Sequence, residues 1–281
     1  MNSCEESLSS REFARLCGLV LAEAGIRLGP EKKTMLEGRL RRRLRALHFD
    51  SWSGYCDYLF AKEGQRDELV PFINAVTTNK TDFFREPRHF ELLTQTVLPD
   101  LAARAANRPL LAWSAACSTG EEPYTLAMVL ADYAEMHPGF RFSILATDIC
   151  TEVLEKAELG VYSAAVVEAV PAALSRKYLM RSRDPHAERV RVVPELRRVV
   201  EFRRLNLIER DYGIADKADI VFCRNVLIYF DRETQQAVLR RLTECLQPQG
   251  YLFLGHSETL HDMGLSLAPV APALYRRIHA L

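Results

Sequence analysis

The sequence lacks long apolar runs and a secretion signal. Its longest apolar runs, at 18–22, 220–223 and 251–254, are far shorter than the about 20 residues that a membrane-spanning helix needs. The N-terminal segment MNSCEESLSS is acidic and polar, whereas a signal peptide starts with positive charge and continues into an apolar stretch. These absences predict a cytoplasmic protein that does not insert into a membrane.

Paired cysteines and a net charge are also missing. The seven cysteines are odd in number, widely spaced and never arranged as C-x-x-C, so we expect neither a disulfide framework nor a metal site. The 37 basic side chains balance 37 acidic ones, which disfavours a general nucleic-acid-binding protein. The 281 residues, 48% of them apolar, suffice for one large domain or two unequal ones with a sizeable core.

Residues 1–78 predict an all-helical N-terminal domain. Ser9 and Glu12 match a capping box ahead of an apolar pattern with helical spacing. A second helix starts near Glu31, and its apolar stripe consists of Leu36, Leu40, Leu44 and Leu47. Basic side chains project from the opposite face of this helix or flank the stripe: Arg39, Arg41, Arg42, Arg43 and Arg45.

From about Leu110 onward, short apolar segments alternate with helical patterns. The expected strands are 110–117, 140–149, 218–226 and 250–256, with one last strand in the tail VAPALYRRI. The expected helices are 121–136, 151–160 and 231–246. This alternation predicts an α/β fold with a parallel, doubly wound sheet. Two strand-like pieces, RVRVV and RRVVEF, interrupt it and predict a small antiparallel insertion over about 176–204.

The first expected strand leads into SAACSTGEEPY, a turn of small residues at the start of a helix. Parallel sheets bind ligands at the carboxyl ends of their strands, where this turn would lie. The dinucleotide pattern G-x-G-x-x-G is absent, and Glu121 and Glu122 would repel a pyrophosphate. The two carboxylates either favour the helix dipole or face a cationic ligand such as S-adenosylmethionine.

Other polar residues stand at the same predicted rim of the sheet. Asp148 ends the second strand, where it either accepts hydrogen bonds from ribose hydroxyls or caps the helix that begins near Thr151. Asn206 follows the third strand-like segment of this region, RRVVEF. Arg224 and Asn225 interrupt the apolar run IVFC, which packing does not explain, so we expect them to belong to a site.

The segment 77–90, TTNKTDFFREPRHF, joins the two halves of the chain. Flexible linkers are rich in Gly, Ser or Pro, and this segment is not. We expect it to fold over a ligand, with polar contacts from Asn79, Thr81 and Arg85. Phe83 and Phe84 are expected to supply a wall of the site.

Taken together, five blocks resemble one family. The blocks are TTNKTDFFRE, WSAACSTGEEPYTLAM, ATDI, DIVFCRNVLIYFD and GYLFLGHSE. In this order, and with the N-terminal RLRRRLRALHF, they resemble the chemotaxis receptor methyltransferases, the CheR family, over nearly the whole chain. The resemblance implies a Rossmann-like S-adenosylmethionine-dependent methyltransferase domain at 99–281, with the small insertion, and a cofactor-contacting linker at 79–98. It also implies transfer of methyl groups to glutamate side chains on the cytoplasmic helices of chemoreceptors, the adaptation step of chemotaxis.

The resemblance also implies roles for individual residues. Glu121 is expected to contact the methionyl part of the cofactor and Asp148 the ribose hydroxyls. Arg85, near the transferred methyl group, and Tyr229 are the expected catalytic residues. The cofactor-binding set consists of Asn79, Thr81, Arg85, Glu121, Asp148, Asn206, Leu207, Arg224 and Asn225. A glutamate carboxylate is ionised at pH 7, so the reaction needs no general base. His89 and His256 lie within family blocks, although a lone histidine is more often structural.

Two basic segments point to partners. Segment 31–48 has seven basic and two acidic residues, net +5, and segment 176–204 has ten and four, net +6. The first is either a solvated helix face or a surface that docks beside glutamate-rich receptor helices; the aromatic residues typical of nucleic-acid binding are missing. In some CheR members the insertion binds a receptor C-terminal peptide as an added strand, but the glycine-rich turn of those members is absent from RSRDPHAERVRV.

We expect a monomer. Two other functions remain open from the residues alone. One is a methyltransferase of the same fold that acts on another protein, and the other is a non-catalytic S-adenosylmethionine-binding scaffold.

Overall fold

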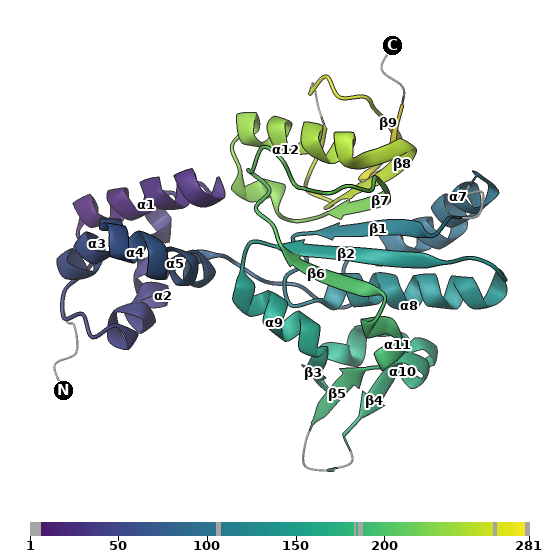
Figure 1. The fold of residues 1–281 in the computed structure, drawn as a ribbon, viewed down its shortest axis with the longest axis horizontal. Helices are drawn as coiled ribbons and strands as arrows, with labels where there is room; N and C mark the ends of the chain where they lie inside the picture. Colours follow the sequence, from purple (N-terminus) through teal and green to yellow (C-terminus); the bar gives the residue numbers. More distant parts are fainter. Residues whose placement is uncertain (1–6, 105–107, 183, 185–187, 261–262, 279–281) are drawn as a thin grey trace.

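The computed structural model describes residues 7–104, 108–182, 184, 188–260 and 263–278. A bundle of short N-terminal helices lies at one end of the molecule, and a twisted sheet with helices on both faces forms the remainder (Figure 1). Within these ranges, no helix combines the length and apolar character needed to cross a membrane.

The N-terminal bundle packs its helices around one apolar core. Its helices are α1 (Ser10–Ala24), α2 (Lys33–Ala46), α3 (Trp52–Phe60), α4 (Lys62–Asp67) and α5 (Leu69–Val76), with a 3-10 turn at Pro30–Lys32. Fully buried core side chains come from several of these helices: Leu16, Leu36, Leu40, Trp52 and Phe72. The predicted capping box is confirmed, because Ser9 Oγ accepts from Glu12 N while the Glu12 carboxylate accepts from Ser9 N.

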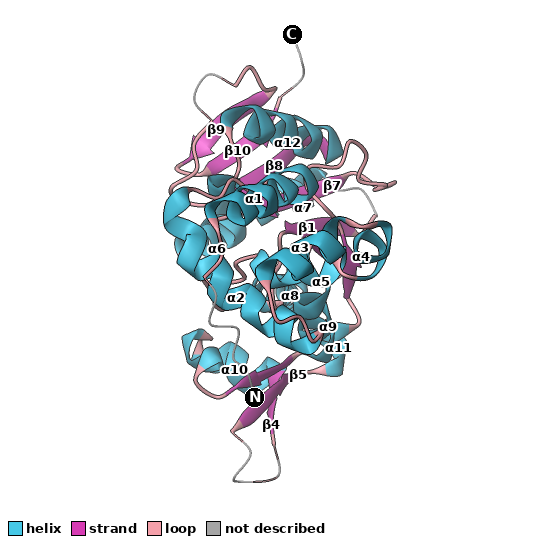
Figure 2. Ribbon diagram, turned by 90° about the vertical axis from the view of Figure 1, so that its left-hand side faces the viewer, coloured by secondary structure: helices cyan, strands magenta, loops and turns pink. Residues whose placement is uncertain are grey.

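Helix α1 ends where it meets the sheet domain. Gly25 caps it in the left-handed region, at φ 69°. A Cβ at this position would lie 2.5 Å from Ile208 Cγ2, so both the conformation and the close approach require glycine. Figure 2, viewed from the side of the bundle, shows its helices in front of the sheet.

The large sheet has the strand order β6-β2-β1-β7-β8-β10-β9. Its strands are β1 (Leu110–Ala115), β2 (Phe142–Asp148), β6 (Val200–Arg204), β7 (Ala218–Cys223), β8 (Leu246–Leu254), β9 (Leu267–Ala271) and β10 (Leu274–Arg277). The first five strands in spatial order are parallel, whereas β10 and β9 run antiparallel to their neighbours. The prediction of one last strand is therefore wrong: the tail forms a hairpin and the sheet is mixed.

Helices cover both faces of the sheet, as the doubly wound prediction requires. Helices α8 (Glu121–Met136) and α9 (Thr151–Leu159) lie on one face and α12 (Arg232–Cys245) on the other (Figure 1). The chain enters the domain through α6 (Arg88–Leu92), a π-helical turn η2 (Leu93–Val97) and α7 (Leu98–Arg104), which share an apolar core with α8. A separate core lies under α12. Strand order reverses between β1 and β7, and ligands bind at such switch points.

A small antiparallel sheet extends from the α8 side of the domain (Figure 1). It consists of β3 (Val161–Ser163), β5 (Arg189–Val192) and β4 (Leu179–Arg181), in this spatial order. Short helical segments accompany it: η3 (Val166–Ala169), α10 (Ala172–Tyr178) and α11 (Pro194–Arg197). The sheet's extent differs from the predicted 176–204, because RRVVEF supplies β6 to the large sheet while β3 lies before that segment. Alternation of apolar residues predicts a strand but does not identify its partner.

A buried ion pair holds α2 against α5. The Glu68 side chain is only 1% exposed, and it accepts hydrogen bonds from Arg43 Nε at 2.9 Å and from Tyr55 OH at 2.9 Å. Arg43 Nη2 contacts the second carboxylate oxygen at 2.5 Å. Burial and the adjacent Glu68 carboxylate raise the pKa of Tyr55 well above its usual value, so its hydroxyl stays protonated and remains a donor.

We expect Arg43→Ala to lower the free energy of unfolding of the bundle by about 3 kcal/mol, because it leaves the Glu68 carboxylate buried without its cation. Arg42→Ala removes an exposed arginine one position away and should change it by less than about 0.5 kcal/mol. Urea unfolding followed by Trp52 fluorescence, with Trp113 replaced by Phe throughout, measures the difference. Equal midpoints for the two variants would contradict the role given to Arg43.

Candidate functional site

A cavity lies at the carboxyl ends of β1, β2 and β7, and the end of the helical bundle closes it. We call it the central cavity. Nine residues of the predicted site line it: Asn79, Thr81, Arg85, Asp148, Asn206, Leu207, Arg224, Asn225 and Tyr229. The fold therefore brings together residues that are up to 150 positions apart in the chain.

The turn between β1 and α8 brings backbone close to the cavity. Three of its residues have positive φ angles: Ala116 at 65°, Ser118 at 50° and Gly120 at 96°. A Cβ on Gly120 would lie 2.8 Å from the Ala157 side chain and 2.8 Å from the Tyr162 hydroxyl. Glycine is therefore required at position 120, both for its positive φ and for its close approach to α9 and Tyr162.

Asp148 is fixed at the end of β2 with both carboxylate oxygens held. Ser118 N donates to Oδ2 at 2.8 Å and Cys150 N donates to Oδ1 at 2.9 Å. The residue is 6% exposed, and burial raises the pKa of its carboxyl although these backbone donors oppose the shift. Each oxygen retains a further lone pair, so the carboxylate can accept two ligand hydroxyls.

The start of α9 is held by a residue that the sequence does not single out. Asn74, on α5, accepts a hydrogen bond from Thr151 N at 3.0 Å and donates to Thr151 Oγ1 at 2.8 Å. Asp148 binds the backbone N–H of Cys150, the residue before the helix, whereas Asn74 binds Thr151 N, so the expectation that Asp148 caps α9 is wrong. In the sequence, the one sign of this role is that Asn74 is a polar residue near the end of an otherwise apolar helix.

Of the two adjacent glutamates, Glu122 lines the cavity and Glu121 does not. Glu121 is 5% exposed and accepts a hydrogen bond from Thr119 Oγ1 at 2.6 Å. Glu122 accepts one from Ser114 Oγ at 2.6 Å and lies 3.2 Å from Arg224 Nε. The two differ because one step along a helix turns a side chain by about 100°, so only one of two adjacent residues can face the cavity.

Burial raises the pKa of the Glu122 carboxyl, and the Arg224 guanidinium opposes the shift. A second cation in the cavity would further favour the charged form of Glu122. The Glu122 side of the cavity is therefore suited to a positively charged ligand group.

Arg224 joins three segments at the back of the cavity. Its side chain is 2% exposed, and Nη2 donates to the Arg85 carbonyl oxygen at 2.6 Å. The guanidinium carbon lies 5.7 Å from the ring centres of Phe90 and Phe222. The arginine thereby connects β7, the linker and α8 in one charged, largely dry contact.

The Glu258 carboxylate holds the turn after β7, and this residue was not predicted to belong to the site. This carboxylate is 5% exposed and accepts hydrogen bonds from the backbone N–H groups of Asn225 and Leu227, each at 2.8 Å, and of Gly255 at 2.7 Å. It supports Asn225 at φ 59°, a strained conformation for a residue other than glycine. Its place in the block GYLFLGHSE was the only available signal.

The linker lies along the cavity, with its first residue held by the β1–α8 turn and a hydrogen bond within the linker itself. Ser118 Oγ donates to the Asn79 carbonyl oxygen at 3.0 Å, and Arg85 Nη1 donates to the Lys80 carbonyl oxygen at 3.1 Å. The prediction that Phe83 and Phe84 form a wall of the site is wrong, because both pack into the domain core. Their rings contact Tyr162 and Phe90, with centres 4.9 and 5.4 Å apart.

The helical bundle supplies the other side of the cavity. The lining residues run from the last residue of α1 to the first turn of α2: Ala24, Ile26, Arg27, Leu28, Lys32 and Met35. Arg27 N donates to the Tyr229 carbonyl oxygen at 3.0 Å, and Asn206 Nδ2 donates to the Glu23 carbonyl oxygen at 2.6 Å. Part of the polar capacity of Asn206 is thus used to hold the bundle in place.

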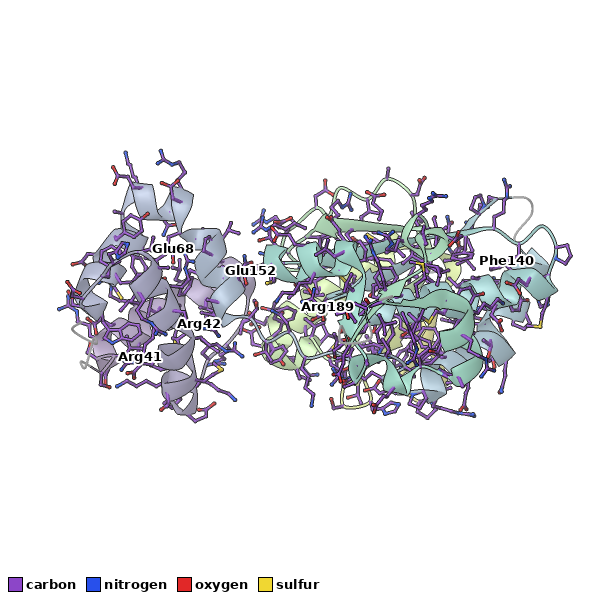
Figure 3. All side chains as sticks on the ribbon, turned by 90° about the horizontal axis from the view of Figure 1, so that it is seen from below. Arg41, Arg42, Glu68, Phe140, Glu152 and Arg189 are labelled. Carbon is purple, nitrogen blue, oxygen red and sulfur yellow. The ribbon has the colours of Figure 1, made fainter. Side chains whose placement is uncertain are left out.

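The five arginines of α2 separate into two groups. Arg39 donates to the carbonyl oxygens of Val76 and Thr77 at 2.6 and 2.8 Å, and Arg43 pairs with Glu68, so both have internal roles. Arg41 pairs with Glu37 at 2.5 Å, whereas Arg42 and Arg45 are exposed. Docking along α2 stays a prediction, for which Arg42 and Arg45 are the exposed members of the set. Figure 3 shows Arg41, Arg42 and Glu68 on the bundle.

Comparison with known proteins gives matches over both parts of the chain. Residues 11–77 match the family model described as the CheR methyltransferase all-alpha domain, and residues 79–270 match the CheR methyltransferase SAM-binding domain. A chemotaxis protein methyltransferase of Salmonella typhimurium is 44% identical over 257 residues, covering 92% of this chain and 86% of the relative. Chemotaxis protein methyltransferase 2 of Pseudomonas aeruginosa is 45% identical over 254 residues, covering 89% and 87%.

The family models together span both the bundle and the sheet domain, and the relatives align over most of their own length. These matches agree with the arrangement of the β1–α8 turn, Asp148 and the Arg224–Asn225 turn around one cavity. The chain belongs to the CheR family of S-adenosylmethionine-dependent methyltransferases.

Proposed function

We propose that this enzyme transfers the methyl group of S-adenosylmethionine to glutamate side chains on the cytoplasmic helices of chemoreceptors. The observation that carries the proposal is the central cavity, which combines two buried carboxylates with Arg85 and Tyr229. The names of the relatives, chemotaxis protein methyltransferases, support the substrate class. In this proposal residues 1–78 receive the substrate, 79–98 contact the cofactor, and 99–281 form the transferase domain.

The polar groups of the cavity suit the parts of the cofactor. Asp148 has free lone pairs for the two ribose hydroxyls, and Glu122 provides negative charge for the amino or sulfonium group. Arg224 Nη1 lacks a hydrogen-bond partner among the described residues and suits a carboxylate. Asn79, Thr81, Asn206, Leu207 and Asn225 complete the lining.

The reaction places modest chemical demands on the protein. S-adenosylmethionine supplies an electrophilic methyl group. The ionised glutamate of the substrate is already a nucleophile, so the transfer needs neither a general base nor a metal. Arg85 positions the substrate carboxylate, and Tyr229 orients it through a hydrogen bond. Because the reactants' charges cancel during transfer, strong stabilisation of either reactant would raise the barrier.

Helix α2 offers a path from the docking surface to the cavity. Lys32 and Met35 line the cavity, while Arg42 and Arg45 are exposed farther along the helix. At about 1.5 Å per residue, the helix extends roughly 20 Å from Lys32 to Arg45. A glutamate-rich receptor helix lying along this face would place one side chain at the cavity while others meet the exposed arginines. We accordingly propose a cytoplasmic monomer that meets its substrate through α2.

We further propose that the small antiparallel sheet is the place where a receptor tail peptide would bind. Binding of a receptor tail peptide would use an edge of the small sheet, but most of the β4–β5 turn (183 and 185–187) lies outside the described residues. A methyltransferase for another protein would retain the same cavity, and a non-catalytic scaffold would bind the cofactor without transferring its methyl group. Methyl transfer to a purified receptor domain separates the three functions.

We expect Asp148→Asn to weaken binding of S-adenosylhomocysteine about 100-fold. The variant loses the charge that accepts two hydroxyl hydrogen bonds, each contributing about 1.5 kcal/mol. Isothermal titration calorimetry measures the affinity, with Asp216→Asn at an exposed position as the matched control. Unchanged affinity in the Asp148 variant would remove its assignment to the ribose.

We expect Arg85→Ala to lower the rate constant of methyl transfer by at least about 100-fold, because the substrate carboxylate loses its positioning partner. Arg88→Ala, which opens an exposed pair with Glu91, should retain nearly full activity. Base-labile label transferred to a receptor cytoplasmic domain gives the rate. Equal rates for the two variants would refute the role of Arg85.

We expect Arg42→Glu and Arg45→Glu each to slow methylation several-fold and to reduce its sensitivity to salt, because a repulsive charge replaces an attractive one. The same change at Arg11, exposed at the far end of α1, is the control. Rates at low and moderate ionic strength measure both effects. Docking along α2 would be contradicted by parallel salt dependence in all three variants and the unmodified enzyme.

A further inference from the structure

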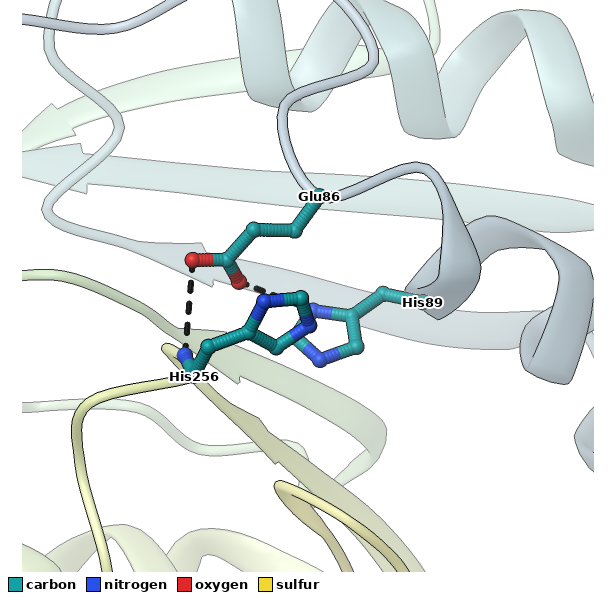
Figure 4. Close-up of side chains that lie close together, drawn as sticks. All are labelled: Glu86, His89 and His256. Carbon is teal, nitrogen blue, oxygen red and sulfur yellow. Dashed lines mark hydrogen bonds and ion pairs between the residues drawn. The ribbon is translucent and has the colours of Figure 1, made fainter.

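A second cluster of chemically active side chains lies beside the central cavity. Glu86, His89 and His256 each direct a potential ligand atom into one small space, and these atoms lie within 4.8 Å of one another (Figure 4). Glu86 belongs to the linker, His89 to α6, and His256 to the turn after β8. Neither histidine has a task in the proposed methyl transfer.

The cluster holds an unusual share of unpaired polar atoms. Eight buried side-chain nitrogen or oxygen atoms in the described part of the chain lack a hydrogen-bond partner, and three of them are potential metal ligands of Glu86 and His89. His89 is 0% exposed, and neither ring nitrogen makes a hydrogen bond, although Nδ1 lies near the Glu86 carboxylate. Leaving a buried polar group unpaired costs about 1–3 kcal/mol, so such a concentration indicates a missing occupant.

The charges around the cluster favour a cation as that occupant. The carboxylates of Glu86 and Glu122 lie 3.8 and 3.2 Å from Arg224 Nε, so these three groups together carry a formal charge of −1 when both acids are ionised. The Arg224 Nε to Glu86 Oε2 distance is 3.8 Å, which is too long for a hydrogen bond. This carboxylate oxygen therefore remains available to a metal ion.

The spacing of two of the ligands already fits a tetrahedral ion. Zinc binds imidazole nitrogen and carboxylate oxygen at about 2.0–2.2 Å, which places neighbouring ligand atoms about 3.4 Å apart. His89 Nδ1 and Glu86 Oε2 are 3.3 Å apart. The His256 ring is exposed, so it can rotate toward the ion while its backbone N–H remains bound to Glu86 Oε1 at 3.3 Å.

We propose that Glu86, His89 and His256 form a site for a divalent transition metal ion of the zinc type, with a solvent molecule as the fourth ligand. Two imidazoles and one carboxylate favour zinc over magnesium or calcium, which prefer oxygen ligands. The ion would tie the linker to the end of β8. It would hold Glu86, at φ 57°, next to Arg85. Its role is structural, and the methyl transfer does not pass through it.

Zinc binding to the full-length chain, first dialysed against EDTA, tests the site. We expect one zinc ion per chain in competition with a chromophoric chelator, and at least 10-fold weaker binding by His256→Ala and Glu86→Gln. His48→Asn removes an exposed histidine on the bundle and should bind like the unmodified chain. Cobalt in place of zinc should give the visible absorption bands of a tetrahedral site, and these should be absent from His256→Ala.

His256 is exposed, so its replacement should preserve the fold, and calorimetry with S-adenosylhomocysteine verifies this. Zinc should raise the unfolding temperature of the unmodified chain and of His48→Asn but not of His256→Ala. Binding below one ion per chain, or equal binding by unmodified chain and His256→Ala, would overturn the proposal and leave water as the occupant. The proposed methyl transfer would stand in either case.

Discussion

The structure around the central cavity depends on one buried cation, the guanidinium of Arg224. It donates a hydrogen bond to the Arg85 carbonyl oxygen of the linker and pairs with the Glu122 carboxylate of α8. These segments come from three regions of the sequence and have no direct chain connection at the cavity. A lysine could not replace it, because a single ammonium lacks the planar arrangement of donors that reaches both partners. The position of the linker, and with it Arg85, therefore follows from β7.

The helical bundle is part of the site as well as a separate apolar core. Asn74 holds the start of α9, Asn206 holds the end of α1, and Arg39 binds the carbonyl groups that precede the linker. These contacts explain why a methyltransferase sheet carries this bundle. The bundle forms one side of the cavity, and α2, which contributes Met35 to the lining, also carries the exposed Arg42 and Arg45. In the proposed function, receptor docking and cofactor binding would therefore share one element.

Much of this arrangement follows from the sequence, for identifiable reasons. Parallel strands end at one edge of a sheet, so Asp148 and the Arg224–Asn225 pair were predictable as neighbours from their places after apolar runs. The choice between Glu121 and Glu122 was not, because it depends on the rotation of α8 about its axis. The contacts of Arg39 and Arg43 within the bundle were not predictable either, because helical periodicity places both residues only at the margin of the apolar stripe. Edge strands such as β6 are equally ambiguous, since their pairing is set by distant residues.

The central claim is that the cavity brings a receptor glutamate carboxylate and the methyl group of S-adenosylmethionine together. The most direct measurement is incubation of the purified chain with methyl-labelled S-adenosylmethionine and a purified receptor cytoplasmic domain, followed by mass-spectrometric assignment of the label. The account predicts a base-labile methyl ester on glutamate side chains. Label on another residue type, or cofactor binding without transfer to any receptor domain tested, would contradict it.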